Sequence, residues 1–204
     1  MAFPPRRLIF LFSLVTILCS TVLPFQRVHA LADRPDHADL PALDVFIEQV
    51  RNGQAADLRG VYVERIFAAA VVQQPEGITD FVSPWREVLT QFRLASQLGS
   101  TGLLAHNNLA GKSFSHLQQG QELYLIYGDG HVARFMVSEI LAYQALRPNQ
   151  EESSFMELGS GTVLTASELF KHVYNRPGAV VLQTCLEMND QLTGGRLFII
   201  ADPV

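Results

Sequence analysis

The chain has 204 residues, 48% of them hydrophobic, and a formal net charge of −5 at pH 7. This length and composition are typical of one globular domain. Nucleic-acid binding needs clustered lysines and arginines to neutralise phosphates, but the sequence contains no basic stripe, and its only lysines are Lys112 and Lys171. The composition therefore argues against a nucleic-acid-binding protein.

Residues 1–30 have the pattern of a targeting segment. Arg6 and Arg7 precede an almost wholly apolar run over residues 8–25, and residues 28–30 (Val-His-Ala) fit a signal-peptidase site. The apolar run is also about long enough to span a bilayer. A cleaved signal peptide and a retained membrane anchor both remain open, and either one predicts an extracytoplasmic protein.

Residues 31–60 are predicted to be a linker that contains a short helix. The first part, residues 31–41, is rich in aspartate and proline. Apolar residues then recur at helical spacing over residues 42–52, and Gly53 is a plausible stop. The main domain is expected to occupy residues 61–204.

The first part of this domain is predicted to be a strand, a helix and a second strand. Residues 61–72 are rich in β-branched and aromatic side chains, which favour a strand. Ser83 and Pro84 resemble a helix start, and the helix is expected to point Trp85 inward and to end near Gly99. Residues 101–106 form a short predicted strand.

The remainder of the chain is expected to be mostly β-structure. A Gly-Asp-Gly sequence at residues 128–130 is a strong hairpin signal. The other expected segments are strands over 122–127, 131–137, 140–146, 180–185 and 194–201, a polar loop over 148–154 and a short helix over 167–175.

Cys185 is the first candidate for chemistry. It ends the predicted strand over residues 180–185 and is the only cysteine outside the targeting segment. A lone cysteine is often a small buried hydrophobe. In an exported domain, however, an unpaired thiol at a strand tip is also a candidate nucleophile. Position alone leaves both roles open.

His106 and Arg196 are the other two candidates. His106 ends an apolar strand and begins a loop, so it is either a structural histidine or a general acid–base residue. Arg196 near the start of the last strand is either a solvated edge charge or a donor to an oxyanion beside a thiolate. No histidines or carboxylates have metal-ligand spacing, so no metal and no cofactor are predicted.

Together these three segments resemble the sortase family. Sortases have a strand ending in a TLxTC motif, an arginine on the next strand and a histidine at the end of an earlier strand. Here residues 181–185 read Val-Leu-Gln-Thr-Cys, with valine in place of the first threonine, and His106 and Arg196 occur in the family's order. The resemblance covers roughly residues 61–204. Residues 148–167 form an insertion-like stretch where sortases vary.

The resemblance implies a mainly β fold, a closed sortase-like β-barrel of about eight strands with a few short helices. It also implies a cysteine transpeptidase that cleaves an LPxTG-like sorting signal. Cys185 would form a thioester, His106 would act as general acid and base, and Arg196 would hold the oxyanion. The residues expected to contact the substrate are Thr184, Leu186 and Asn107.

The implied partners are surface proteins that carry a C-terminal sorting signal, together with an amine acceptor from the cell wall or from another protein. Two alternatives share the same three residues. One is a cysteine hydrolase that releases the acyl group to water, and the other is a non-catalytic cell-surface barrel that binds peptides.

Overall fold

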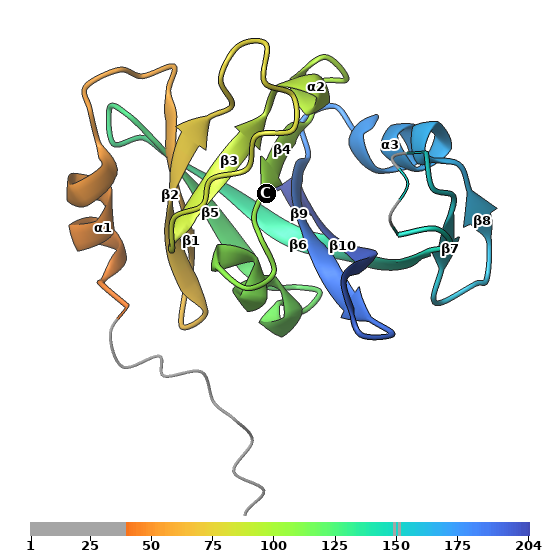
Figure 1. Ribbon diagram of the computed structural model, residues 1–204. Coiled ribbons are helices and arrows are strands. Elements are labelled where there is room, and N and C mark those ends of the chain that lie inside the picture. Colours follow the sequence, from red (N-terminus) through yellow and green to blue (C-terminus); the bar gives the residue numbers. More distant parts are fainter. Residues whose placement is uncertain (1–39, 149, 151) are drawn as a thin grey trace, which may run out of the picture. The chain divides into compact units, whose positions relative to one another are not determined.

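The computed structural model describes residues 40–148, 150 and 152–204 (Figure 1). The predicted targeting segment over residues 1–30 lies outside the described residues, as does the linker before Leu40. No helix in the described ranges has the length and apolar character needed to cross a membrane.

Within the described residues, ten strands form a single sheet in the order β10-β9-β4-β3-β2-β1-β5-β6-β7-β8. A further pairing of β10 with β6 closes eight of these strands into a barrel and leaves β7 and β8 as an extension from β6. The expectation of a mainly β, closed barrel of about eight strands is confirmed. The strands are β1 (Leu58–Val63), β2 (Phe67–Gln73), β3 (Val88–Phe92), β4 (Thr101–Leu104), β5 (Glu122–Tyr127), β6 (Val132–Ala145), β7 (Phe155–Glu157), β8 (Val163–Leu164), β9 (Val180–Met188) and β10 (Gln191–Pro203).

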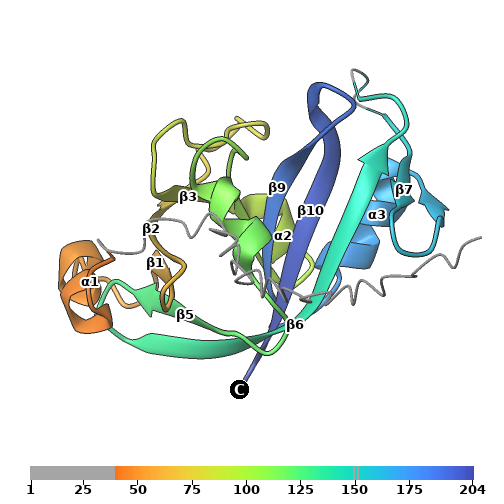
Figure 2. The ribbon, with the colours of Figure 1, turned by 90° about the horizontal axis from the view of Figure 1, so that it is seen from below.

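The helices among the described residues are short. They are α1 (Leu43–Val50), α2 (Arg93–Ser96), the 3-10 helix η2 (Ala110–His116) and α3 (Ala166–Tyr174). Residues of α1, α2 and α3 pack in clusters outside the barrel, whereas Ala110 and Phe114 of η2 pack in the cluster inside it. The helices predicted over residues 42–52 and 167–175 are therefore confirmed. In both ribbon views α3 and β7 lie on the opposite side of the barrel from α1 (Figures 1 and 2).

Local sequence explains how α3 begins. The side chain of Thr165 accepts a hydrogen bond from the Glu168 N–H, and the Glu168 carboxylate accepts one from the Thr165 N–H at 2.8 Å. This reciprocal capping box satisfies backbone donors that the first helical turn leaves free. The helix then buries Leu169, Val173 and Tyr174 against the outer face of the barrel.

Strands β9 and β10 are buried on both faces. Leu182 and Ile199 belong to the cluster inside the barrel. Val181, Phe198 and Ile200 belong to a second cluster outside it, which also contains residues of α3 and β7. Because both faces of these strands are buried, their sequences are continuous apolar runs and do not alternate between apolar and polar residues.

Residues 61–72 do not form one strand. They are parts of β1 and β2, which pair as an antiparallel hairpin with Val63 opposite Phe67. Arg65, in the connecting turn, has a positive φ of 61°. The turn interrupts the apolar run, and the barrel begins at Leu58, within the predicted linker.

The helix predicted from Ser83 to near Gly99 is wrong over most of its length, and only its last part, α2, is helical. Residues 88–92 instead form β3, which lies between β2 and β4 and buries Leu89 and Thr90 completely. Glu87 has a φ of 56°, which a right-handed helix cannot accommodate. Trp85, expected to point inward, is 71% exposed.

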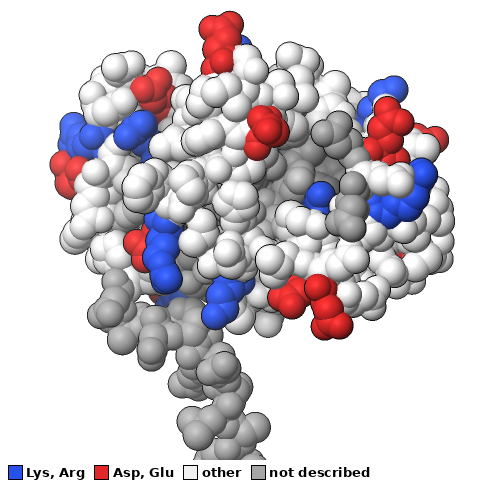
Figure 3. All heavy atoms as spheres, viewed as in Figure 1, with Lys and Arg blue, Asp and Glu red and all other residues white. Residues whose placement is uncertain are grey.

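Charged side chains of both signs are scattered over the face shown in Figure 3, and no broad basic patch covers it.

Candidate functional site

Cys185 and Arg196 lie side by side on neighbouring strands. They are direct partners in the antiparallel β9–β10 pair. The neighbouring pair Leu197–Thr184 faces the barrel interior, and the pair Phe198–Gln183 faces outward. Because side chains alternate along a strand, Cys185 and Arg196 both face outward.

The pairing type brings the two side chains close together. The Gln183 carbonyl accepts the Ala105 N–H at 3.1 Å, so the peptide group of Gln183 faces β4. By alternation the peptide group of Cys185 faces the same way, which makes Cys185–Arg196 a non-hydrogen-bonded pair. In such pairs the Cβ atoms are about 4.5–5.5 Å apart.

His106 follows the strand next to β9. Strand β4 runs parallel to β9 with Leu104 opposite Gln183, and it ends at Leu104, two residues before His106. The side chain of Ala105 packs inside the barrel, and His106 is exposed. Cys185 and Arg196 therefore share one outer face, and His106 lies just beyond the end of the adjacent strand.

The strand ends differ from those predicted. Cys185 does not end its strand, because β9 continues to Met188 and β10 begins at Gln191. Asn189 and Asp190 connect the two strands and have φ values of 52° and 61°. Positive φ at both residues is the signature of a type I′ hairpin turn. Arg196 therefore lies within β10 rather than at its start.

The guanidinium group of Arg196 has definite partners. It donates to the carbonyl oxygens of Thr193 at 3.2 Å and Gly195 at 2.8 Å. Its central carbon lies 5.7 Å from the ring centroid of Phe155, a cation–π distance. These contacts place the positively charged guanidinium group of Arg196 on the side of Cys185 that faces β7.

Two hollows share this arginine. The aromatic hollow, of about 190 Å³, lies between α3 and β10 and is lined by Phe92, Phe155, Phe170, Tyr174, Gln183 and Arg196 among others. The loop hollow, of about 290 Å³, lies under the connection between β6 and β7, where Pro148, Gln150, Ser153 and Phe155 face Arg196. Because they have Phe155 and Arg196 in common, the two hollows adjoin.

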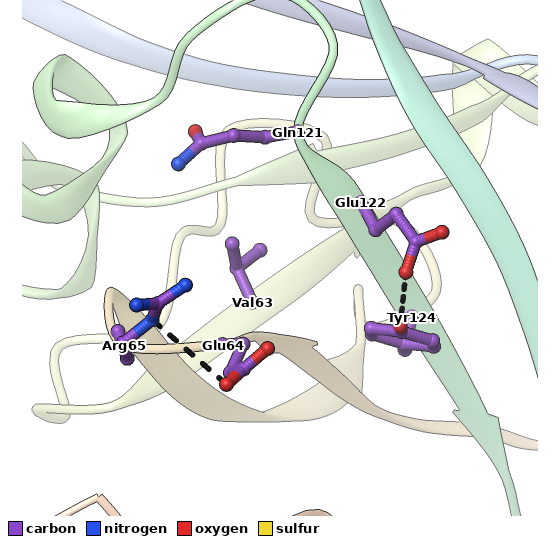
Figure 4. Close-up of a pocket in the computed structure, with 6 residues that line it drawn as sticks. All are labelled: Val63, Glu64, Arg65, Gln121, Glu122 and Tyr124. Carbon is purple, nitrogen blue, oxygen red and sulfur yellow. Dashed lines mark hydrogen bonds and ion pairs between the residues drawn. The ribbon is translucent and has the colours of Figure 1, made fainter.

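A third hollow lies next to the thiol. This cysteine hollow, of about 190 Å³, is formed by η2 and the last part of β9. Its polar lining comes from Asn107, Lys112, Ser115, Thr184, Cys185 and Glu187. Cys185 is half-buried and its thiol is free. A similarly small hollow at the β1–β2 turn, near Glu64 and Glu122, lies on other strands (Figure 4).

Thr184, predicted to contact substrate, has a structural position. It is 3% exposed, and its hydroxyl donates to the Ala105 carbonyl at 2.9 Å. Gly111 packs tightly against it: a Cβ on Gly111 would lie 2.3 Å from the Thr184 hydroxyl and 2.7 Å from the His106 carbonyl. Thr184 thus fastens β9 to the segment that carries His106.

The other two predicted substrate residues lie around the cysteine hollow. Asn107 donates from its side-chain amide to the Leu192 carbonyl at 3.0 Å, which ties the loop after β4 to the β9–β10 hairpin. Leu186 packs against the interior cluster and pairs with Gly195 on β10. Their contact with a substrate stays a prediction.

The sequence did not identify the residues that line the Arg196 side of the site. Gln183 lies two residues before Cys185 on the same predicted strand. Because side chains alternate along a strand, the sequence could have indicated that Gln183 faces the same side as Cys185. Tyr174, whose hydroxyl donates to Gln183, and Phe155 come from distant segments with no such signal. Burial raises the pKa of Tyr174 far above its ordinary value, which keeps this hydroxyl a donor. Over the described residues, no three His, Cys, Asp or Glu side chains are grouped to hold a metal ion.

Neither a family model nor a curated protein matches the chain. The solved structures similar to it include sortases. Sortase C1 from Streptococcus suis is 15% identical with a TM-score of 0.47, covering 79% of this chain and 78% of that one. Sortase C-1 from Actinomyces oris is 12% identical with a TM-score of 0.49, covering 81% and 82%. Sortase A from Corynebacterium diphtheriae is 13% identical with a TM-score of 0.48, covering 84% and 72%.

Proposed function

We propose that this protein is an extracytoplasmic, sortase-like cysteine transpeptidase with Cys185 as nucleophile, His106 as general acid–base and Arg196 as oxyanion donor. The observation that supports the proposal is the strand pairing: Cys185 on β9 lies opposite Arg196 on β10, and β4, which ends two residues before His106, lies next to β9. The motif around Cys185 and the order of the three residues independently resemble sortases.

In the first half-reaction the Cys185 thiolate attacks a peptide carbonyl of the substrate. The tetrahedral oxyanion is stabilised by the N–H groups of Arg196, which reorient from the carbonyls of their own strand. The C–N bond then breaks, and protonated His106 gives its proton to the leaving amine. The products are an acyl-thioester on Cys185 and a free amine.

In the second half-reaction an acceptor amine attacks the thioester carbonyl. Neutral His106 takes a proton from the attacking nitrogen, and the C–S bond breaks to return the Cys185 thiolate. The new bond is an amide. Cys185 thiolate and protonated His106 are both regenerated, so the cycle needs no oxidant, reductant or cofactor.

The substrate we propose is an LPxTG-like sorting signal of a surface protein. The aromatic hollow offers a mostly apolar surface next to Arg196, which suits the apolar residues of such a signal. The loop hollow lies under the insertion-like segment between β6 and β7 and would contact the rest of the signal. An acceptor from the cell wall or another protein would complete the reaction.

The test is mass spectrometry of the purified full-length protein after incubation with a panel of LPxTG-type peptides and a small amine. The proposal expects an acyl adduct on Cys185 and a product that carries the amine. Adduct with only hydrolysed product would indicate a hydrolase on the same site. No adduct from any peptide, with Cys185 alkylated no faster than a model thiol, would contradict catalysis and favour a peptide-binding barrel.

A further inference from the structure

We propose that Asn107 is a positioning residue: through one bulge on β10 it links the segment that carries His106 to the guanidinium group of Arg196. This inference rests on the proposed function and concerns how two of its residues move together. The side-chain amide of Asn107 donates to the Leu192 carbonyl at 3.0 Å. The guanidinium group of Arg196 donates to the carbonyl of the next residue, Thr193, at 3.2 Å. Both hydrogen bonds thus end on consecutive peptide groups of β10.

The bulge that offers these carbonyls is built into the strand pair. Residues 192–194 of β10 have only Glu187 opposite them on β9. Extra residues on one strand interrupt the ladder and leave main-chain groups out of the regular pairing. The carbonyls of Leu192 and Thr193 lie in this interruption, where side chains of the candidate site donate to them.

Two glycines fix the end of the bulge. A Cβ on Gly194 would lie 2.5 Å from the Met188 carbonyl oxygen. A Cβ on Gly195 would lie 2.4 Å from the Tyr143 carbonyl oxygen. Both separations are far shorter than a van der Waals contact, so the glycines pack the main chain of β10 tightly against β9 and β6. The two residues before Gly194 are exposed, so their peptide groups have room to turn.

Release of Arg196 from the bulge changes the contact that Asn107 makes. In the proposed reaction the N–H groups of Arg196 leave the Thr193 carbonyl to bind the oxyanion. The peptide group that carries this carbonyl is then free to turn, and it shares the Cα of Thr193 with the peptide group that holds Asn107. Substrate bound at Arg196 therefore alters the position of the residue next to His106. Such coupling requires an element that both sites bias, and the bulge is that element.

The main chain around His106 is also fixed to β9 and within its own loop. The His106 carbonyl accepts the N–H groups of Leu109 and Gly111, both at 3.0 Å. The preceding carbonyl accepts the hydroxyl of Thr184 on β9. The bond from Asn107 adds a contact with β10, the strand of the oxyanion donor, so it determines how the His106 segment lies relative to that donor.

The first experiment uses NMR to measure hydrogen exchange of the Asn107 side-chain amide in the full-length protein and in Arg196→Met, without substrate. Methionine keeps an unbranched side chain but has no donor for the Thr193 carbonyl. The exchange rate of the Asn107 amide is expected to rise about two- to tenfold, which corresponds to the net contribution of one hydrogen bond. The matched control is the side-chain amide of Gln119, which donates to the Ser138 carbonyl at 3.1 Å and should exchange equally in both proteins. An unchanged Asn107 rate would overturn the coupling.

The second experiment tests the positioning role through the rate of thioester formation on Cys185. Asn107→Ala is expected to lower kcat about tenfold with little change in KM, but less than about twofold in the Arg196→Met background, where the link is already lost. Asn107→Gln keeps the amide donor and should restore part of the rate. Equal effects of Asn107→Ala in both backgrounds would overturn the positioning role. If no peptide forms a thioester, only the transpeptidase proposal is overturned, because the exchange experiment needs no substrate.

Discussion

Replacement of Thr184 by valine tests whether the contact between β9 and the segment before His106 holds the site together. Thr184 and Ala105 are both buried, and the hydroxyl-to-carbonyl distance is 2.9 Å. Valine keeps the branched shape but has no hydroxyl, so the buried Ala105 carbonyl loses this hydrogen-bond donor. Loss of a buried hydrogen bond with one partner left behind costs about 1–3 kcal/mol.

Crowding at Gly111 adds to this cost. The site that a Cβ on Gly111 would occupy is only 2.3 Å from the Thr184 hydroxyl, so a methyl group in place of that hydroxyl is tightly confined. We therefore expect Thr184→Val to lower the unfolding free energy by about 2 kcal/mol, within the hydrogen-bond range above. For a domain of this size that corresponds to a fall in Tm of about 4–8 °C.

The assay is urea and thermal unfolding of Thr184→Val and Thr184→Ser, together with the rate of thioester formation on Cys185. Serine retains the hydroxyl, so it should keep most of the rate even though it loses a buried methyl group. Valine should slow thioester formation in addition to lowering stability, because the segment before His106 loses its link to β9. A valine variant as stable as wild type, or a serine variant with an equally reduced rate, would refute the reasoning.

Three further predictions concern the site and its support. Arg196→Lys retains the positive charge but loses the planar fork of N–H donors. The rate of thioester formation should therefore fall about 10- to 1000-fold, while folding is unaffected. An unchanged rate would exclude an oxyanion role for Arg196. Tyr174→Phe should lower the unfolding free energy by about 1 kcal/mol, because it loses a hydrogen bond. Tyr143→Phe should be neutral or stabilising, because the buried Tyr143 hydroxyl has no hydrogen-bond partner among the described residues; equal losses in the two variants would contradict this contrast. Hydrogen bonds from Thr165, first from its backbone and then from its side chain, lower the pKa of Glu168 below its ordinary value. The carboxylate therefore contributes fully to stability above the ordinary carboxyl pKa, and this contribution is lost as the pH falls. Glu168→Gln should flatten the acidic part of a stability–pH curve.

Several elements could be predicted because their signals are local. The Gly-Asp-Gly sequence at residues 128–130 gives the β5–β6 hairpin, with a glycine at φ of 93° that few other residues would accept. The capping box of Thr165 and Glu168 likewise sets the start of α3 within four residues of chain. In both cases the hydrogen bonds that define the structure join near neighbours.

The region before β4 shows where local signals fail. Ser83 and Pro84 favour a helix start, but pairing with β2 and β4 extends residues 88–92 into a strand and buries Leu89 and Thr90. The Ser83 N–H donates to the Thr90 hydroxyl at 2.8 Å, a contact that an uninterrupted helix from Ser83 would not make. Burial between two strands outweighs the intrinsic preference of a few residues.

The sequence by itself determined the identity of the three candidate residues, the barrel fold class implied by its resemblance, and the short elements with local caps and turns. The tertiary structure alone decided which face Cys185 and Arg196 occupy and which hollows adjoin them. The reason is that a shift of one residue in strand register moves every side chain to the opposite face of a strand. That register is set here by pairings such as Leu104 with Gln183, which are far apart in the chain.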